Sequence, residues 1–280
     1  MRKLLGSALA MTMAFVASGA AQAQSTFHVK EFDYKQGDWV FETINAYQGG
    51  FRPRSDRVQW GHELGIAYGV TNWWLPKVLI SFDKDEGRSH EVQRLLFENT
   101  FTLRPLAEDT DGFGFAWFQS VEGALNDRQT NSTAFGPIFT AQMGKFSLST
   151  NTFLEKTFGQ NREQGMNALI AWQTRYEIID KVKIGFEGYT FIPEIGARIR
   201  TPETGIVNRV GPVLIFEVDL PGLAAKSNGG GMKGGTMRHV AGAGNGKAEV
   251  PHAEIEFGVL FGTTNYTPDT TGKVNMHIKF

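Results

Sequence analysis

The last nine residues of the chain, 272–280, alternate strictly between apolar and polar side chains. In an extended strand one face carries Val274, Met276, Ile278 and Phe280, and the other face carries Asn275, His277 and Lys279. The pattern predicts a β-strand with one wholly apolar face. Taken alone, it fits a half-buried strand of a soluble β-sandwich as well as a strand of a membrane barrel. The other segments of the chain therefore decide between the two folds.

The same alternation recurs in segments that are long for soluble strands. In residues 58–69, an apolar face runs from Trp60 to Tyr68 and Glu63 lies on the opposite face. Strands that cross a bilayer need about 9–11 residues, whereas strands in soluble proteins average about 5–6. About twelve segments qualify: 37–47, 58–69, 74–82, 92–103, 113–123, 133–143, 146–156, 166–177, 182–192, 209–219, 253–262 and 272–280. We therefore predict an all-β fold, a transmembrane antiparallel up-and-down β-barrel with an even number of strands.

The connections between these segments alternate in length. Those after the first, third, fifth, seventh and ninth strands are longer and polar, and those after the second, sixth and eighth contain only a few residues. Outer-membrane barrels place long loops outside the cell and short turns in the periplasm. This pattern predicts that both ends of the barrel wall are periplasmic. Residues 49–57 are then expected to form the first outer loop, and residues 24–36 a periplasmic lead-in.

The first 23 residues have the features of a secretory signal peptide. Arg2 and Lys3 precede an apolar run at 4–16, and residues 21–23 (Ala-Gln-Ala) offer a small-residue cleavage site. We expect residues 24–280 to form the barrel. The chain contains no Cys, so disulfides do not stabilise it. No later stretch approaches the ~20 apolar residues that a transmembrane helix requires.

Charge and histidine spacing argue against several kinds of partner. Without Arg2 and Lys3, the 28 basic residues become 26, against 29 acidic residues. A nucleic-acid partner would favour a basic surface, so we predict none. The six His are scattered along the chain. We therefore predict no metal site and no cofactor.

Residues 221–252 break the alternating pattern. They are rich in Gly, and residues 228–231 (Asn-Gly-Gly-Gly) have the composition of a flexible linker. The strand order places this stretch on the periplasmic side, where a short turn is expected. We predict an irregular insertion. A hidden pair of strands there would raise the total to about fourteen, which is also even.

Two short motifs resemble a known group of proteins. Residues 68–72 (Tyr-Gly-Val-Thr-Asn) and the ending from Thr267 to Phe280 resemble the transporter-like, or phenol meta-pathway type, outer-membrane β-barrels of Gram-negative bacteria. The barrel resemblance covers essentially the whole chain after the signal peptide. It implies an outer-membrane location with lipid around the wall and passage of small molecules. It also implies that the barrel-assembly machinery recognises the C-terminal strand ending in Phe280.

The inner faces of the predicted strands carry more acidic than basic residues. The acids are Glu42, Glu63, Glu98, Glu122, Glu155, Glu187, Glu217, Glu254 and Glu256, and the bases are Lys77, Arg94, Arg175, Lys183, Arg209 and Lys279. A barrel interior tolerates charge, whereas Arg or Lys at the lipid midplane costs about 2–4 kcal/mol. As lumen-lining residues we single out Glu42, Glu63, Glu98, Glu122, Arg94, Arg175, Glu187, Arg209, Glu217 and Glu254.

Two interpretations of this interior stay open. A narrow pore lined by acids would prefer cations weakly. A salt-bridged interior would instead close the lumen and stabilise the barrel. About twelve strands fall between filled eight-stranded barrels and open barrels of about sixteen strands. We also expect an aromatic girdle at the periplasmic end, formed by Trp39, Trp73, Trp74, Tyr176 and Phe280.

A passive or weakly selective small-molecule channel is the function that these patterns favour. The alternative is a closed structural or adhesion barrel. A remote alternative is an outer-membrane acyl hydrolase, which would need a Ser nucleophile and a His base. His62 lies on a predicted lipid face and His90 follows Ser89 in a charged loop, but no Ser stands in a recognisable nucleophile setting. We therefore predict that the chain is not an enzyme.

Overall fold

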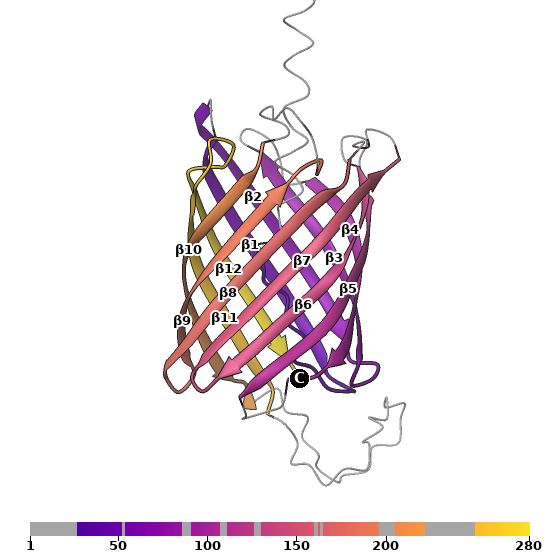
Figure 1. The fold of residues 1–280 in the computed structure, drawn as a ribbon, viewed down its shortest axis with the longest axis vertical. Coiled ribbons are helices and arrows are strands. Elements are labelled where there is room, and N and C mark those ends of the chain that lie inside the picture. The colour runs from indigo at the N-terminus through magenta and orange to yellow at the C-terminus, as the bar shows by residue number, and fades with distance from the viewer. Residues whose placement is uncertain are drawn as a thin grey trace, which may run out of the picture.

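The computed structural model describes residues 27–51, 54–85, 91–106, 111–125, 130–159, 162, 165–195, 205–221 and 250–280. Within these ranges, twelve antiparallel strands close into one barrel (Figure 1). The expected signal peptide and all but the ends of segment 221–252 lie outside the described residues, so these two predictions stay predictions. Among the described residues, no helix is long and apolar enough to cross a membrane.

Each strand pairs with its neighbours in sequence, and the last strand pairs with the first. The strands are β1 (Trp39–Phe51), β2 (Arg54–Tyr68), β3 (Trp74–Asp85), β4 (Glu91–Arg104), β5 (Gly112–Ala124), β6 (Asn131–Met143), β7 (Phe146–Phe158), β8 (Asn167–Ile179), β9 (Val182–Ile192), β10 (Val207–Asp219), β11 (His252–Gly262) and β12 (Thr270–Lys279). The predicted all-β, up-and-down barrel of about twelve strands is confirmed.

The seam between β1 and β12 closes the barrel. Its pairs run from Val40–Lys279 to Gly49–Thr270. Trp39 N–H donates to the carbonyl of Phe280 (2.8 Å), and Phe280 N–H donates to the carbonyl of Trp39 (3.0 Å). Both ends of the wall therefore lie at one end of the barrel, which is the lower end in Figure 1. We call this the Phe280 end.

Alternation sets which side chains face outward. Along β2, Trp60, Leu64 and Ile66 are 42–48% exposed, whereas Glu63 between them is 2% exposed. The strands contain between 10 (β12) and 15 (β2) residues, enough to cross a bilayer at a tilt. The outer face is thus apolar and the inner face is mixed, as a lipid-embedded barrel requires.

The first connection differs from the prediction. Residues 49–57 are not a loop, because β1 and β2 continue to pair as far as Phe51 and Arg54. The register shifts between Gly49 and Phe51, and Gly50 adopts a φ of 78°. A side chain at Gly50 would collide with Asp269, whose N–H donates to the Gly50 carbonyl. Glycine at position 50 therefore permits the β-bulge, and β1 and β2 pair again beyond it at Phe51 and Arg54.

The remaining connections divide between the two ends of the barrel. The Phe280 end has the connections 69–73, 105–111, 144–145, 180–181 and 220–251. The opposite end has 52–53, 86–90, 125–130, 159–166, 193–206 and 263–269. The longest connection therefore lies at the Phe280 end, on the side that the strand order predicts.

Candidate functional site

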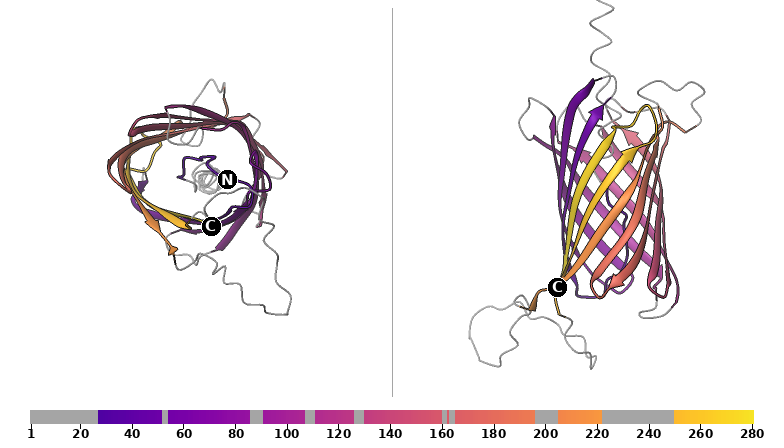
Figure 2. Two further views of the ribbon diagram at one scale, coloured as in Figure 1. Left: turned by 90° about the horizontal axis from the view of Figure 1, so that it is seen from below. Right: turned by 90° about the vertical axis from the view of Figure 1, so that its left-hand side faces the viewer.

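Residues 27–38, the N-terminal segment, run inside the barrel. Phe27, Val29, Phe32 and Tyr34 are only 1–7% exposed. The left view of Figure 2 shows this indigo start of the described chain within the ring of strands. The predicted periplasmic lead-in is therefore wrong for residues 27–34, whereas Lys35 and Gln36 are exposed. Four apolar or aromatic side chains would meet water outside the barrel, and each such burial contributes about 1.5–3 kcal/mol.

The inner wall offers apolar partners where the segment crosses it. Phe27 and Val29 pack with Ala46, Tyr189 and Leu260. The rings of Phe27 and Tyr189 meet edge to face, with centroids 5.4 Å apart. Phe32 and Tyr34 belong to a second cluster with Ala67, Leu75, Ala116, Phe118, Ile138 and Phe153. The lumen is thus not uniformly polar, and its apolar patches bind the segment.

Polar side chains of the wall also bind the backbone of the segment. Asn151 accepts from the Lys30 N–H (2.6 Å) and donates to the Lys30 carbonyl (2.9 Å). The Phe27 carbonyl accepts from Lys273 Nζ (3.1 Å) and from Asn275 Nδ2 (2.9 Å). A segment without secondary structure needs such partners, because unpaired buried backbone groups are costly. The wall is therefore built to hold these residues.

The first of two buried charge clusters centres on Lys273. Its Nζ lies 2.6 Å from Glu187 Oε2 and 2.5 Å from Glu256 Oε1. Gln173 Nε2 donates to both carboxylates, at 2.9 and 2.7 Å, and Arg175 lies 3.7 Å from Glu256. The side chains of Lys273 and Glu187 are fully buried, and that of Glu256 is 3% exposed. We call these five residues of β8, β9, β11 and β12 the Lys273 network.

The second cluster, the Glu98 network, includes a residue of the segment. Lys30 Nζ contacts both oxygens of Glu98, at 2.7 and 2.8 Å. Lys77 Nζ contacts both oxygens of Glu42, at 2.6 Å, and lies 3.9 Å from Glu98. Two carboxylates thus face two ammonium groups, and the N-terminal segment supplies one of the two cations.

Two histidines from opposite ends of the chain meet beside Glu42. His277 lies directly across the seam from Glu42, with its Nδ1 3.2 Å from Glu42 Oε1. The His28 ring of the segment lies against the His277 ring, with centroids 4.4 Å apart. The sequence predicted no metal site because its histidines are scattered. His28 and His277 are far apart in the sequence, and only the fold brings them together.

The ten residues singled out as lumen-lining occupy the wall as follows. Buried, at 8% exposure or less, are Glu42, Glu63, Arg94, Glu98, Arg175, Glu187 and Arg209, and partly buried are Glu122, Glu217 and Glu254. They also have partners: Arg94 pairs with Glu122, Lys183 with Glu217, Arg175 with Glu254 (3.2 Å) and Arg209 with Gln48 (2.8 Å). That solutes pass along them stays a prediction.

Sequence reasoning missed several charged residues of this interior. Lys273 shares the inner face with Asn275 and His277, so the alternation could have identified it. His28 and Lys30 were missed because residues 24–36 were read as polar lead-in. The only signal there was the spacing of the four apolar or aromatic residues that the wall buries.

The predicted girdle residues lie at the Phe280 end. Trp39, Trp73, Tyr176 and Phe280 are 39–54% exposed. Trp74 is partly buried, and its Nε1 donates to Asn99 Oδ1 (2.9 Å). Asn99 interrupts the apolar outer face of β4, and the indole satisfies it. The girdle's contact with lipid headgroups stays a prediction.

Some space remains inside the barrel at the Phe280 end. A cavity of about 920 Å³ separates the N-terminal segment from the wall. Glu31 and Asp33 of the segment line it, together with Arg175, Glu177 and Lys183 of the wall. The lumen is therefore narrowed by the segment, and the space that remains beside it is charged.

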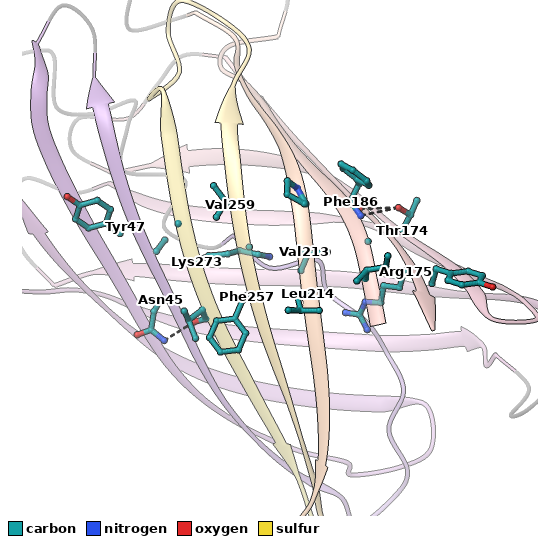
Figure 3. Close-up of a pocket in the computed structure, with 18 of the residues that line it drawn as sticks. Asn45, Tyr47, Thr174, Arg175, Phe186, Val213, Leu214, Phe257, Val259 and Lys273 are labelled. Atoms are coloured by element: carbon teal, nitrogen blue, oxygen red, sulfur yellow. Dashed lines mark hydrogen bonds between the residues drawn. The ribbon is translucent and has the colours of Figure 1, made fainter. Parts of the chain in front are cut away.

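A second hollow, of about 1050 Å³, lies on the outer face over β7–β12 and the adjoining β1 and β2 (Figure 3). Outward-facing Phe186, Phe257 and Val259, which are 45–58% exposed, contribute to its lining. His62 also lines it, and its Nδ1 lies 2.7 Å from Asn45 Oδ1, an amide and not a Ser hydroxyl. His90 lies outside the described residues. In a membrane, lipid chains would fill this apolar hollow.

Comparisons with known proteins identify the fold but no sequence family. No family model matches the chain, and no curated protein matches it. A solved structure, the COG4313 outer membrane channel from Pseudomonas putida F1, aligns with a TM-score of 0.54 at 12% identity, over 90% of this chain and 99% of that chain. The KdgM porin, solved with disordered oligogalacturonate, aligns at 0.45 and 9% identity, and the NanC porin at 0.46 and 10%. Both alignments cover 86% of this chain and 98% of the porin. The alignment at a TM-score of 0.54 shows that the chain shares the fold of the COG4313 channel barrel.

Proposed function

We propose that this chain is a passive, weakly selective channel for small molecules, and that its N-terminal segment closes the lumen at rest. One observation carries the proposal: a segment that is not part of the wall occupies the lumen of a barrel that closes without it. Every strand pairs with two neighbours, and residues 27–36 contribute to none of these pairs. Displacing the segment would therefore keep all the strand pairs of the wall and would open the lumen.

The segment joins the wall through a short, well-anchored corner. Gly37 adopts a φ of 97°, and its N–H donates to the Gly69 carbonyl (2.8 Å). Gly69 N–H in turn donates to the Asp38 carbonyl (2.8 Å). These bonds fix the start of β1 independently of residues 27–36. Movement of the segment about this corner would not disturb the seam.

The charge of the wall supports a weak preference for cations. Three inner-face residues, Asp83 (7% exposed), Glu177 and Lys273 (3%), add to those found from the sequence. Nine acids and six bases thereby become eleven acids and seven bases. Displacement of the segment also removes Lys30 from Glu98. An open lumen would then expose an excess of carboxylates to passing ions.

We also propose the outer membrane as the location. The apolar outer face suits lipid, and Phe280, 52% exposed at the end of the closing strand, is available to the barrel-assembly machinery. Replacing Phe280 by Asp should reduce the amount of heat-modifiable protein in outer-membrane fractions, as seen on unheated gels.

Deletion of residues 27–36 tests the channel. In planar bilayers the deletion variant should give single-channel conductance severalfold higher than the chain that keeps these residues. Heat-modifiable migration on a gel establishes that the variant is folded. A folded deletion variant that gives no current steps would contradict the proposal.

A closed structural or adhesion barrel is the second candidate. The Lys273 network favours it, because buried ion pairs and hydrogen bonds join side chains of four strands, β8, β9, β11 and β12, on the inner face of the wall. The same bilayer measurement separates the two candidates. A closed barrel should stay silent with or without residues 27–36, whereas a closed channel should conduct once they are removed.

A further inference from the structure

His28, Glu42 and His277 present ligand atoms that all lie within 4.8 Å of one another. Glu42 and His277 are direct partners across the β1–β12 seam, and both point into the lumen. His28 comes from the N-terminal segment. The carbonyl of the preceding residue, Phe27, is held by Lys273 and Asn275, which fixes the backbone beside His28. Three separate parts of the fold therefore converge on this cluster.

We propose that these three residues bind a divalent transition metal, with Zn²⁺ as the ion to test, and that the metal fastens the N-terminal segment to the barrel seam. Among the described residues, this is the one group of three metal-ligand side chains that lies so close together. The binding site itself is independent of the channel function. Its effect on opening rests on the proposed function.

Two imidazoles and one carboxylate form a ligand set that favours transition metals over Mg²⁺ and Ca²⁺, which prefer all-oxygen sites. Bonds of about 2.0–2.2 Å bring the ligands of a tetrahedral metal to about 3.4 Å from one another. His277 Nδ1 and Glu42 Oε1 already lie 3.2 Å apart. Ligand atoms separated by up to 4.8 Å thus need to approach one another by at most about 1.4 Å, which rotation of the side chains provides, and a water completes the coordination.

The charges around the cluster are compatible with a cation. Lys77 contacts both oxygens of Glu42, and it also lies 3.9 Å from Glu98. Lys77 can therefore shift towards Glu98 when the metal takes one oxygen of Glu42, and act as an outer partner of the ligating carboxylate. The carboxylates of Glu42 and Glu98 therefore balance the ammonium groups of Lys77 and Lys30, so these four groups carry no excess positive charge that would repel a metal.

Binding would stabilise the closed arrangement. A metal that bridges His28 to the seam binds only when the segment is in the lumen, and a ligand stabilises the state that binds it. Chelation should therefore loosen the segment, and added metal should hold it. The wall supplies two of the three ligands. Replacing His28 therefore removes the bond between the metal and the segment without changing the wall.

Cobalt titration of the tag-free protein in detergent tests the site, since Co²⁺ reports its ligands by its visible absorption. His28→Gln and His277→Gln should each weaken Co²⁺ binding at least about tenfold, the loss seen even for outer-shell changes at metal sites. His252→Gln is the matched control, because His252 lies at the start of β11 and outside the cluster. Zn²⁺ should displace Co²⁺ from the unsubstituted protein and from His252→Gln.

Unchanged Co²⁺ affinity in His28→Gln and His277→Gln, both shown to be folded by heat-modifiable migration, would overturn the site. Bilayer recordings then test whether the metal fastens the segment to the seam. Zn²⁺ should lower the open fraction of the unsubstituted channel and of His252→Gln, but not of His28→Gln. Equal inhibition of all three would overturn this effect of the metal on opening. A protein that binds Co²⁺ but whose segment-deletion variant carries no current contradicts the channel alone, and a conducting protein without the site contradicts the metal proposal alone.

Discussion

The Lys273 network and the Glu98 network are both buried and charge-balanced, yet they belong to different parts of the molecule. Every member of the Lys273 network is a strand residue, so its contacts between wall residues do not need the segment, although Arg175 also pairs with Glu31 of the segment (3.2 Å). In the Glu98 network, Lys30 of the segment supplies one of two cations. The first network should stabilise the wall, and the second should control whether the segment stays in the lumen.

Burial makes both networks consequential. Removing one partner of a buried ion pair leaves an uncompensated charge and costs about 3–5 kcal/mol, far more than the pair contributes by itself. At the Lys273 network this cost falls on the folded wall. At the Glu98 network the cost of losing Lys30 is smaller, because Lys77 stays 3.9 Å from Glu98. This cost appears as a shift between closed and open channel, because the segment can leave the lumen.

The largest expected effect is that of Lys273→Met. We expect it to lower the free energy of unfolding by about 3–5 kcal/mol, because Glu187 and Glu256 lose their shared cation. Urea unfolding in lipid vesicles, followed by tryptophan fluorescence, measures the change. The control is Lys181→Met, which removes an exposed pair with Asp219 at the β8–β9 turn and should leave unfolding unchanged.

Lys273 also donates to the Phe27 carbonyl. The loss should therefore be repeated in the variant that lacks residues 27–36. If Lys273→Met destabilises the protein only when the segment is present, the division between the two networks is wrong.

Lys30→Met should have an intermediate effect, on opening and not on the wall. Loss of a hydrogen-bonded charge contact weakens docking by about 1.5–3 kcal/mol, which shifts the closed–open equilibrium about 10- to 100-fold. Single-channel open fraction in planar bilayers measures it. Lys35→Met, at an exposed position of the same segment, is the control and should leave the open fraction unchanged. An equally closed Lys30→Met channel, or one whose wall unfolds more easily, would contradict the proposed role of the Glu98 network.

Glu98→Gln and Glu122→Gln should produce the smallest effect, a reduced preference for cations. Lys30 neutralises Glu98 in the closed arrangement, so the reduction from Glu98→Gln should be clearest in the variant that lacks residues 27–36, whereas Arg94 of the wall stays beside Glu122 and makes its effect smaller. Reversal potentials under a salt gradient measure it, with Asp219→Asn, an exposed acid at the end of β10 that pairs with Lys181, as the control. Identical reversal potentials for all variants would refute an acidic open lumen.

Much of the barrel could be predicted because alternation is a local property. Successive side chains of a strand face opposite sides. The alternating pattern alone therefore places Trp60 on the outer face and Glu63 on the inner face. Strand order followed from the same reasoning, since neighbouring strands pair in an up-and-down barrel. The loop predicted at 49–57 failed because polar composition does not reveal a hairpin that keeps pairing beyond the membrane-sized part of its strands.

Partners across the lumen could not be predicted in the same way. Lys30 meets Glu98, and His28 meets His277, only because the closed barrel surrounds the segment. Likewise, the sequence predicted charged inner faces but could not say which acid pairs with which base. Those pairs depend on register, tilt and closure, which bring distant strands to one level of the lumen.

The sequence by itself determined a barrel of about twelve strands with an apolar outside, a charged inside and a closing strand that ends at Phe280. Only the tertiary structure decided that residues 27–34 lie within that barrel. The reason is physical: a two-residue period records which side of a sheet a residue faces, whereas the contents of a lumen depend on all the strands at once. Phe27 and Val29 acquire apolar partners only after β1, β9 and β11 have closed around them.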